Sequence, residues 1–221
     1  MTASLKTRKR ILIVDDHPVV RRGMAGVLNA EEDLEISGEA SNAAQAMDAV
    51  KQGKPDLVLL DLSLGDDSGL ELIHDLKAMH EDLAILVVSI HDESLFAERV
   101  LKAGAKGYIN KQMALDHIVN AVRRVLSGKI YLSPDMANRM LSQVANGVKP
   151  GEESPLERLS DREMEVYRML GEGKGTREIA KRLHLSMKTI ETYREHIKDK
   201  LNLKDSNEMV CHAARWVAEQ S

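Results

Sequence analysis

The sequence predicts a doubly wound α/β domain of the (βα)5 type with a five-stranded parallel sheet, followed by an all-α domain of four helices. Within the first 126 residues, short apolar runs alternate with segments of helical periodicity. Three of these runs are apolar throughout rather than at every second position, so both faces of those strands are expected to be buried between helices. From residue 156 onwards only helical periods appear.

Five predicted strands alternate with five predicted helices in the first domain. The strands span residues 10–15, 34–40, 56–61, 84–89 and 105–110. The helices span residues 17–30, 42–53, 68–79, 93–104 and 114–128. Gly53 and Gly104 are typical helix stops. In a sheet of this type, binding sites lie at the carboxyl ends of the strands near the topological switch point.

The second half of the chain contains a linker and four helical segments. Residues 128–155 pass from a Met-rich helical stretch to a Gly/Pro/Ser/Glu-rich stretch, which predicts a partly helical linker that is flexible around residues 146–155. The helical segments cover residues 160–173, 176–185, 186–203 and 206–220. The predicted domains are therefore an N-terminal tail, an α/β domain, a linker and a helical domain, with bounds 1–9, 10–127, 128–155 and 156–221.

Hydroxyl side chains mark the starts of the predicted C-terminal helices. Ser160 has Glu163 three residues later, which predicts a capping box. Ser186 and Ser206 are predicted N-caps, and Thr176 is predicted to cap the helix that follows it. The short connections between the middle helices indicate a helix-turn-helix.

The distribution of charge along the chain is more informative than the net charge of -4. Residues 10–126 carry 12 Lys/Arg against 20 Asp/Glu, a net of -8, whereas residues 174–204 carry 9 against 4, a net of +5. This asymmetry predicts two modules with different partners. The single cysteine, Cys211, excludes an internal disulfide. Because neither a secretory signal nor an apolar run of about 20 residues is found, a cytoplasmic location is expected.

Three carboxylates end two of the predicted strands. Asp15 and Asp16 stand at the end of the first strand, and Asp61 stands at the end of the third. Carboxyl ends of parallel strands meet at one edge, where these charges repel one another unless a cation joins them. Hard oxygen ligands suit Mg²⁺. The alternative is that Asp15 and Asp16 form a helix N-cap pair before Pro18 and that Asp61 is a loop residue.

A hydroxyl and an ammonium group join these carboxylates. Ser89 closes the fourth predicted strand and Lys111 closes the fifth. This set predicts a phosphoryl-acceptor site in which the Asp61 carboxylate is the nucleophile. The metal and Lys111 would neutralise charge on the transferring group, and Ser89 would hydrogen-bond one of its oxygens.

Residues 10–126 resemble the receiver domain of response regulators. The matching stretches are residues 11–24, 55–64, 68–72, 87–90 and 102–111. The resemblance implies that a sensor histidine kinase phosphorylates Asp61. It also implies that Asp15, Asp16 and Asp61 hold Mg²⁺, with the Ser63 backbone carbonyl as a further ligand. Such a receiver catalyses only its own phosphorylation and dephosphorylation.

The same resemblance implies a conformational switch. Ser89 and Lys111 match the switch hydroxyl and the strand-five lysine of the family, and Tyr108 matches an aromatic residue that reorients with the hydroxyl. The alternative for Tyr108 is a half-buried strand tyrosine. Two departures concern the surrounding loops: Leu64 and Gly65 stand where a Met-Pro pair is common, with Asp66 and Asp67 beside them, and Gln112 replaces a common proline.

The glycine-rich residues 171–176 do not form a phosphate-binding loop, because the G-x-x-x-x-G-K-[ST] pattern and a preceding strand are both missing. Residues 159–201 instead resemble, nearly end to end, the LuxR-type helix-turn-helix, with residues 186–200 as the recognition helix. Combined with a receiver, this is the NarL/FixJ type of response regulator. The resemblance implies binding of double-stranded DNA and, after phosphorylation, a homodimer.

The recognition helix offers two sets of candidate DNA contacts. Residues expected to face base edges are Glu191, Thr192 and Glu195. Residues expected to contact the DNA backbone are Lys188, Thr189, Arg194 and Lys198. The alternatives are a solvated charged face, and intrahelical pairing of the two glutamates with neighbouring lysines.

The last helix is interpreted as core packing, and in the resembling family it also pairs DNA-bound subunits, with Trp216 and Cys211 near that seam. His17, His91 and His212 are interpreted as surface or packing residues, and no His/Cys spacing suggests zinc.

The sequence also allows two rival functions. A metal-dependent aspartyl-phosphate hydrolase typically has a second Asp two residues after the nucleophile, where this chain has Ser63. A receiver that only dimerises, without phosphorylation, is disfavoured by the intact acceptor set.

Overall fold

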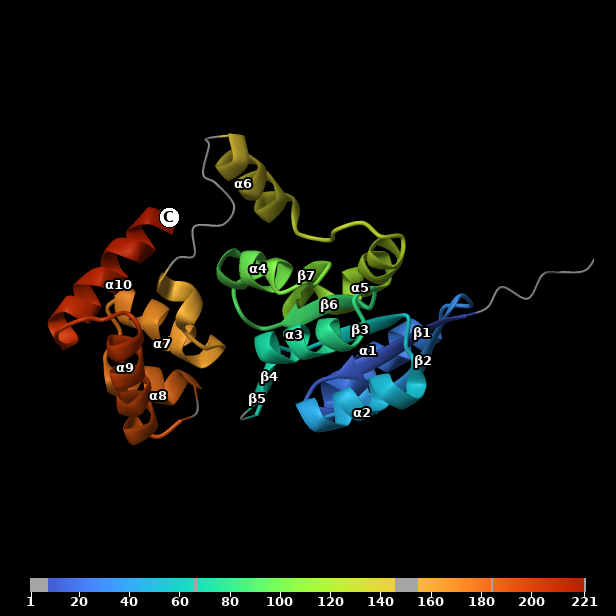
Figure 1. The fold of residues 1–221 in the computed structure, drawn as a ribbon, viewed down its shortest axis with the longest axis horizontal. Coiled ribbons are helices and arrows are strands. Elements are labelled where there is room, and N and C mark those ends of the chain that lie inside the picture. The colour runs from blue at the N-terminus through green and yellow to red at the C-terminus, as the bar shows by residue number, and fades with distance from the viewer. Residues whose placement is uncertain (1–7, 66, 146–154, 184, 221) are drawn as a thin grey trace, which may run out of the picture. The chain divides into compact units, whose positions relative to one another are not determined.

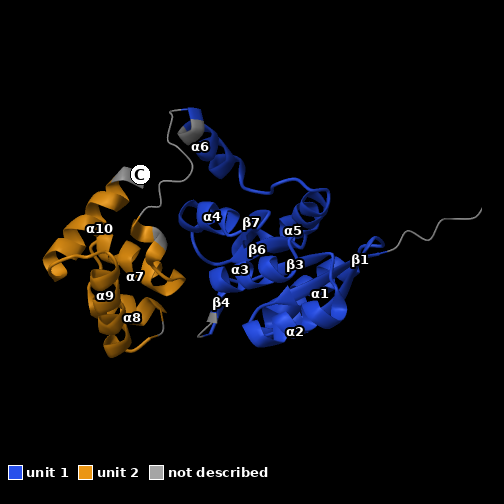
Figure 2. Cartoon of the chain, in the orientation of Figure 1, with its two compact units in different colours: residues 1–148 blue, residues 149–221 orange. Residues whose placement is uncertain are grey.

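The chain folds into two compact units, residues 1–148 and 149–221 (Figure 2). The structure, a computed structural model, describes residues 8–65, 67–145, 155–183 and 185–220. The division between the units lies inside the predicted linker, and most of the segment predicted to be flexible lies outside the described residues. Over the described ranges, no helix is long and apolar enough to cross a membrane.

A five-stranded parallel sheet forms the centre of the first unit, as the sequence predicts (Figure 1). Its order is β2-β1-β3-β6-β7, and its strands are β1 (Lys9–Val14), β2 (Leu34–Ala40), β3 (Leu57–Leu60), β6 (Ala84–Ser89) and β7 (Gly107–Asn110). Val14 pairs with Leu60 and Leu60 with Val87, so the carboxyl ends of these three strands lie together. Because β1 lies between β2 and β3, the strand order reverses there, as expected at a switch point.

Helices cover both faces of the sheet. The core between the sheet and helices α1 (Pro18–Asn29) and α5 (Lys111–Leu126) contains alternate strand residues such as Ile11, Ile13 and Leu59. Helices α2 (Ala43–Gly53), α3 (Gly69–Met79) and α4 (Glu93–Lys102) contact one another in succession. Strand residues of opposite parity, such as Leu12 and Val58, are also fully buried. Burial on both faces explains why the strands are apolar throughout.

Two features of the first unit go beyond the prediction. A short antiparallel pair, β4 (Ser63–Leu64) and β5 (Asp67–Ser68), begins two residues after Asp61. Between α5 and the next helix, Tyr131 forms a parallel bridge with Gly107 of β7. That next helix, α6 (Pro134–Ala145), lies in the linker that is predicted to be partly helical. Asp66 lies outside the described residues.

The second unit is helical. It contains the 3₁₀ helix η1 (Pro155–Arg158) and helices α7 (Asp161–Gly171), α8 (Thr176–Leu183), α9 (Met187–Lys200) and α10 (Ser206–Gln220). Helix α7 contacts α9 and α10, and α8 contacts α9. Its fully buried side chains include Tyr167, Ile179, Ile190, Ile197 and Met209. The four predicted C-terminal helices are thus confirmed.

Helix caps agree with the sequence at two of four positions. The capping box of Ser160 and Glu163 forms, and Ser186 caps α9. The prediction for Ser206 is wrong, because Asp205 Oδ1 accepts the N–H groups of Asn207 and Glu208. The prediction for Thr176 is also wrong. Thr176 is the first residue of α8, and the carbonyl of Gly175 accepts the N–H of Ile179.

Gly69 is the first residue of α3, and its backbone packs closely against the backbone of Leu62, the residue after Asp61. A Cβ at this position would lie 2.5 Å from Leu62 Cα. We expect Gly69→Ala to lower the free energy of unfolding of the first unit by about 1–3 kcal/mol, because a backbone atom cannot yield as a side chain does. Urea unfolding followed by far-UV circular dichroism measures this. The control is Gly53→Ala at the end of α2, where a Cβ meets nothing within 4 Å; equal losses in both variants would contradict the prediction.

Candidate functional site

The structure brings the predicted carboxylates together. Asp15 and Asp61 follow the adjacent strands β1 and β3, and their exposed fractions are 0% and 2%. Ligand atoms of Asp15, Asp16, His17 and Asp61 lie within 4.8 Å of one another. The N-cap of α1 is His17, which makes no side-chain cap hydrogen bond, so the alternative of an Asp15–Asp16 capping pair is not borne out.

Lys111 joins two of these carboxylates. Its Nζ lies 2.7 Å from Asp15 Oδ2 and 2.6 Å from Asp61 Oδ2. Burial raises the pKa of the Asp61 carboxyl more than the Lys111 ammonium lowers it, and the charge of Asp15 adds to the rise. Burial alone would lower the pKa of Lys111, but attraction to Asp61 and the hydrogen bonds to both carboxylates raise it. Lys111 therefore stays protonated, yet one ammonium does not balance three carboxylates.

The residues present fit a divalent metal ion. The second oxygen of Asp61, Oδ1, is buried and has no hydrogen-bond partner in the part of the chain that the structure describes. Carboxylate oxygens are the ligands that Mg²⁺ prefers, and Mg²⁺ retains several waters. The imidazole of His17, whose Nδ1 lies 2.5 Å from Asp16 Oδ1, is 63% exposed and is a poorer match for a hard cation.

The predicted switch residues lie at the same edge of the sheet. Ser89 ends β6 and Tyr108 lies in β7, and both are fully buried. The Tyr108 hydroxyl donates a hydrogen bond of 2.8 Å to the carbonyl of His91. Burial raises the pKa of this phenol, which keeps it a donor. The alternative of a half-buried Tyr108 is wrong, because helix-covered β7 leaves that side chain no exposed surface.

His91 is a residue at this site that sequence reasoning missed. It is 4% exposed, and its Nε2 lies 2.8 Å from Ser63 Oγ. The packing interpretation fits its burial, and the surface interpretation does not. The sequence offers one signal for this contact. His91 stands two residues after Ser89 and Ser63 stands two residues after Asp61, so both follow strand ends that the sequence places at the same edge of the sheet.

The recognition helix α9 exposes only part of the predicted DNA-contact set. Lys188, Glu191, Thr192 and Glu195 are exposed. Arg194 is 17% exposed in its side chain and donates from Nη1 to Thr176 Oγ1 at 2.9 Å. The remaining two contacts are local: Thr189 Oγ1 lies 2.8 Å from Ser186 Oγ, and Lys198 pairs with Glu195. The intrahelical alternative for Glu195 is thus present in this DNA-free structure.

A buried glutamate ties the recognition helix to α7. Glu163, 2% exposed, accepts a hydrogen bond of 2.6 Å from Lys200 Nζ, and its other oxygen lies 3.5 Å from His196 Nδ1. It also accepts the Ser160 N–H at 2.7 Å. Burial alone would raise the pKa of this carboxyl, but the Lys200 ammonium and the hydrogen bonds from Ser160 outweigh burial and hold its pKa below the usual value. The charged form of Glu163 therefore stabilises the packing of α9 against α7.

On the last helix, α10, His212 Nδ1 hydrogen-bonds Tyr167 of α7 and the Trp216 ring lies 5.6 Å from the Tyr167 ring. The packing interpretation of α10 and His212 fits these contacts. Cys211 is exposed.

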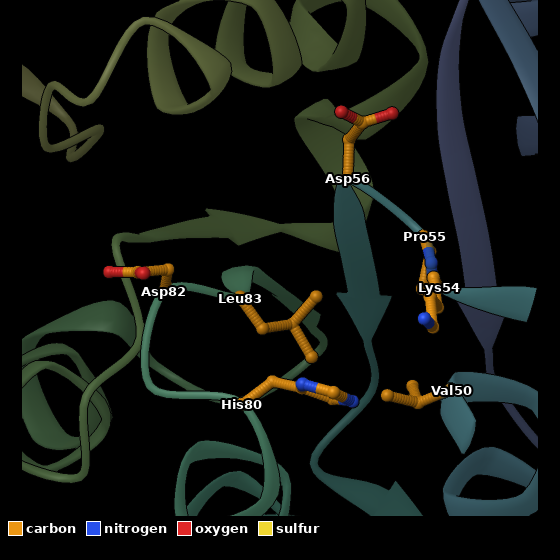
Figure 3. A pocket seen from close by; sticks show the side chains of 7 residues that line it. All are labelled: Val50, Lys54, Pro55, Asp56, His80, Asp82 and Leu83. Carbon is orange, nitrogen blue, oxygen red and sulfur yellow. The ribbon is translucent and has the colours of Figure 1, made fainter.

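A separate pocket of about 460 Å³ lies at the opposite end of β3 (Figure 3). Its lining residues are Val50, Lys54, Pro55, Asp56, His80, Asp82 and Leu83. Asp56 precedes β3 and Asp61 follows it, so this pocket is distinct from the carboxylate cluster. None of the predicted site residues lines it.

Comparison with known families gives two matches. Residues 11–123 match the family model of the response regulator receiver domain. Residues 157–213 match that of the bacterial regulatory proteins of the luxR family.

Known proteins resemble the chain over nearly its whole length. The oxygen regulatory protein NreC of Staphylococcus carnosus is 35% identical over 93% of this chain and 97% of its own. The response regulator GacA of Pseudomonas protegens is 34% identical over 93% and 95% of the two chains. The structure of RcsB from Salmonella enterica serovar Typhimurium bound to the rprA promoter with the phosphomimetic BeF₃⁻ has a TM-score of 0.57 at 25% identity, covering 94% of this chain and 99% of RcsB.

The Glu163 contacts generate a pH-dependent prediction. Because the folded-state pKa of Glu163 is lowered, its stabilisation is complete above the ordinary carboxyl pKa and is lost as pH falls through the folded-state value. At pH 7, Glu163→Gln should lower the free energy of unfolding of the second unit by about 1–3 kcal/mol. The difference from wild type should shrink below about pH 4.

Urea unfolding followed by fluorescence of Trp216, the one tryptophan, measures this difference. The matched control is Glu178→Gln in α8, whose partner Arg182 lies on an exposed surface. Exposed pairs contribute about 0–1 kcal/mol, so the control should change little. A Glu163→Gln effect that stayed constant from pH 7 to pH 3.5 would contradict the assignment.

Proposed function

Since the chain belongs to the response regulators that join a receiver domain to a LuxR-type DNA-binding domain, we propose that Asp61 is its phosphoacceptor and that phosphorylation there controls DNA binding. The chain is a two-component transcription regulator rather than a conventional enzyme. The observation that carries the proposal is the Lys111 ammonium, which bridges Asp15 and Asp61 at the carboxyl edge of the sheet.

The chemistry of the proposed step is phosphoryl transfer to a carboxylate. An Asp61 oxygen attacks the phosphorus of a kinase phosphohistidine, the new O–P bond forms, and the P–N bond breaks with its electron pair returning to the imidazole. Lys111 balances the negative charge that gathers on the phosphoryl oxygens. Asp15, Asp16, Asp61 and the Ser63 backbone carbonyl would hold Mg²⁺, which when bound neutralises phosphoryl charge.

The phosphoryl group would then act on Ser89 and Tyr108. Ser89 is fully buried at the end of β6, the strand next to β3. We propose that its hydroxyl hydrogen-bonds a phosphoryl oxygen on Asp61. A two-state element is required for a switch. We assign that role to Tyr108, whose hydroxyl is held by the His91 carbonyl in this structure.

DNA binding is assigned to α9. Lys188, Glu191, Thr192 and Glu195 form the exposed part of the candidate DNA-contact set, and Thr189, Arg194 and Lys198 reach DNA after releasing local partners. A related structure, that of two RcsB dimers bound to two parallel DNAs, supports a dimer on DNA. We propose that the phosphorylated chain likewise binds DNA as a homodimer, and that a sensor histidine kinase is its phosphodonor.

The hydrolase alternative lacks its acid/base. Ser63 stands two residues after Asp61, and its hydroxyl pairs with His91 rather than offering a carboxyl group. Slow loss of the phosphoryl group to water is the one turnover expected of this site.

The phosphoacceptor assignment is tested by intact mass after incubation with acetyl phosphate and Mg²⁺. Wild type should gain one labile phosphoryl adduct, and Asp61→Asn should gain none, because an amide is not a nucleophile for this transfer. The matched control is Asp56→Asn, at the opposite end of the same strand (Figure 3), which should label like wild type. An adduct on Asp61→Asn, or none on wild type, would sink the assignment.

The DNA-contact assignment is tested on a random-sequence duplex at several salt concentrations. Lys188→Ala should weaken binding and reduce the salt slope by about 1, since a Lys that contacts phosphate releases about one counterion. The control is Lys51→Ala on the exposed side of α2. Equal salt slopes for wild type and Lys188→Ala would remove Lys188 from the interface.

A further inference from the structure

His91 lies between the loop after Asp61 and the switch residues. It follows Ser89 by two residues in the connection between β6 and α4, yet its side chain is buried. Its ring lies 4.8 Å from the ring of Phe96 in α4, with an interplanar angle of 32°. A histidine that only filled space here would need no polar partner for Nε2 of its ring.

The Nε2 atom of His91 has a specific partner. His91 Nε2 and Ser63 Oγ are 2.8 Å apart, and either can be the donor, depending on the imidazole tautomer. Ser63 is the first residue of β4 and stands two residues after Asp61. The contact thus connects the loop that follows β3 to the loop that follows β6.

The backbone of His91 holds both switch residues. Its N–H donates to Ser89 Oγ at 3.2 Å, and its carbonyl accepts the Tyr108 hydroxyl at 2.8 Å. A displacement of His91 therefore alters the partners of Ser89 and Tyr108 together. Because buried polar groups are costly to leave unpaired, such a displacement requires these hydrogen bonds to be exchanged in concert.

We propose that His91 is a positioning residue that couples the loop after Asp61 to Tyr108 through its side-chain hydrogen bond with Ser63. The inference rests on the proposed function, since it concerns how occupancy of the Asp61 site reaches the switch. When a phosphoryl group or its mimic settles on Asp61, the adjoining Ser63 loop adjusts. His91 transmits that adjustment to Tyr108 because Nε2 follows Ser63 Oγ.

The test uses the full chain labelled with 3-fluorotyrosine. The four tyrosines are few enough to resolve by ¹⁹F NMR, and Tyr108→Phe identifies the Tyr108 signal. Beryllium trifluoride with Mg²⁺ is the phosphoryl mimic, and bound beryllium trifluoride gives its own ¹⁹F signals. One spectrum therefore reports both occupancy of the site and the response of Tyr108.

Two variants remove the hydrogen bond from opposite sides. His91→Phe keeps a ring against Phe96 but removes Nε2, and Ser63→Ala removes the hydroxyl. In each, the Tyr108 shift induced by the mimic should fall to half of the wild-type shift or less, at full occupancy. The double variant should fall no further, because both changes break one contact. His91→Gln, whose amide can reach Ser63, should recover part of the shift.

The control is His80→Phe, a histidine at the far end of the sheet beside the pocket of Figure 3, which should respond like wild type. Signals of Tyr131, Tyr167 and Tyr193 report whether each variant is folded, and if His91→Phe does not fold, Ser63→Ala decides.

Bound mimic with more than half of the Tyr108 shift retained in Ser63→Ala would overturn the inference and leave the proposed function standing. Wild type without a bound-mimic signal would overturn the proposed function, and the inference with it.

Discussion

The ion bridge from Lys111 to Asp15 and Asp61 is the interaction on which the candidate site depends. Removing carboxylates from water costs several kcal/mol per charge unless the charges are paired, and removing one partner of such a cluster leaves an uncompensated buried charge. The bridge balances only part of the cluster, as the raised pKa of Asp61 indicates. This imbalance makes the edge of the sheet electrostatically suited to a further cation, as the proposed Mg²⁺ site requires.

The sheet supplies the geometry that the bridge requires. Asp15 and Asp61 are brought together because β1 and β3 are parallel neighbours in register, and β7 brings Lys111 to the same edge from the far side of β6. Strands buried on both faces hold this edge rigidly, since tightly packed cores do not deform continuously. Residues separated by as many as 96 positions in sequence, from Asp15 to Lys111, therefore act as one site.

The sequence predicts the sheet, the helices of both domains and the acidic edge because each leaves a local pattern: apolar runs, helical periods, and polar residues directly after strands. It does not predict the hydrogen bond between Ser63 and His91, because neither the two-residue strand that begins at Ser63 nor the loop that contains His91 has a periodicity that would reveal their pairing. The β4–β5 pair is not predicted for the same reason, because each strand is only two residues long. At Ser206, a neighbouring aspartate competes for the same cap, and a carboxylate one residue earlier reaches the free N–H groups. Local patterns thus predict elements, whereas contacts between loops depend on the assembled fold.

The edge of the sheet beyond β7 connects the strand that carries Tyr108 to the predicted linker. Tyr131 donates its N–H to the Lys106 carbonyl at 3.0 Å, and its own carbonyl accepts the Tyr108 N–H at 2.9 Å. Gly107 permits this approach, because a Cβ there would lie 2.7 Å from the Tyr131 carbonyl oxygen. Two residues further on, the Ser133 N–H donates to Glu93 at the start of α4. The segment that leads into α6 is therefore held by the strand that carries Tyr108 and by the helix that follows His91. β7 carries Tyr108 and α4 begins two residues after His91. In the proposed switch, a rearrangement of these two residues would therefore reach the segment that leads into α6.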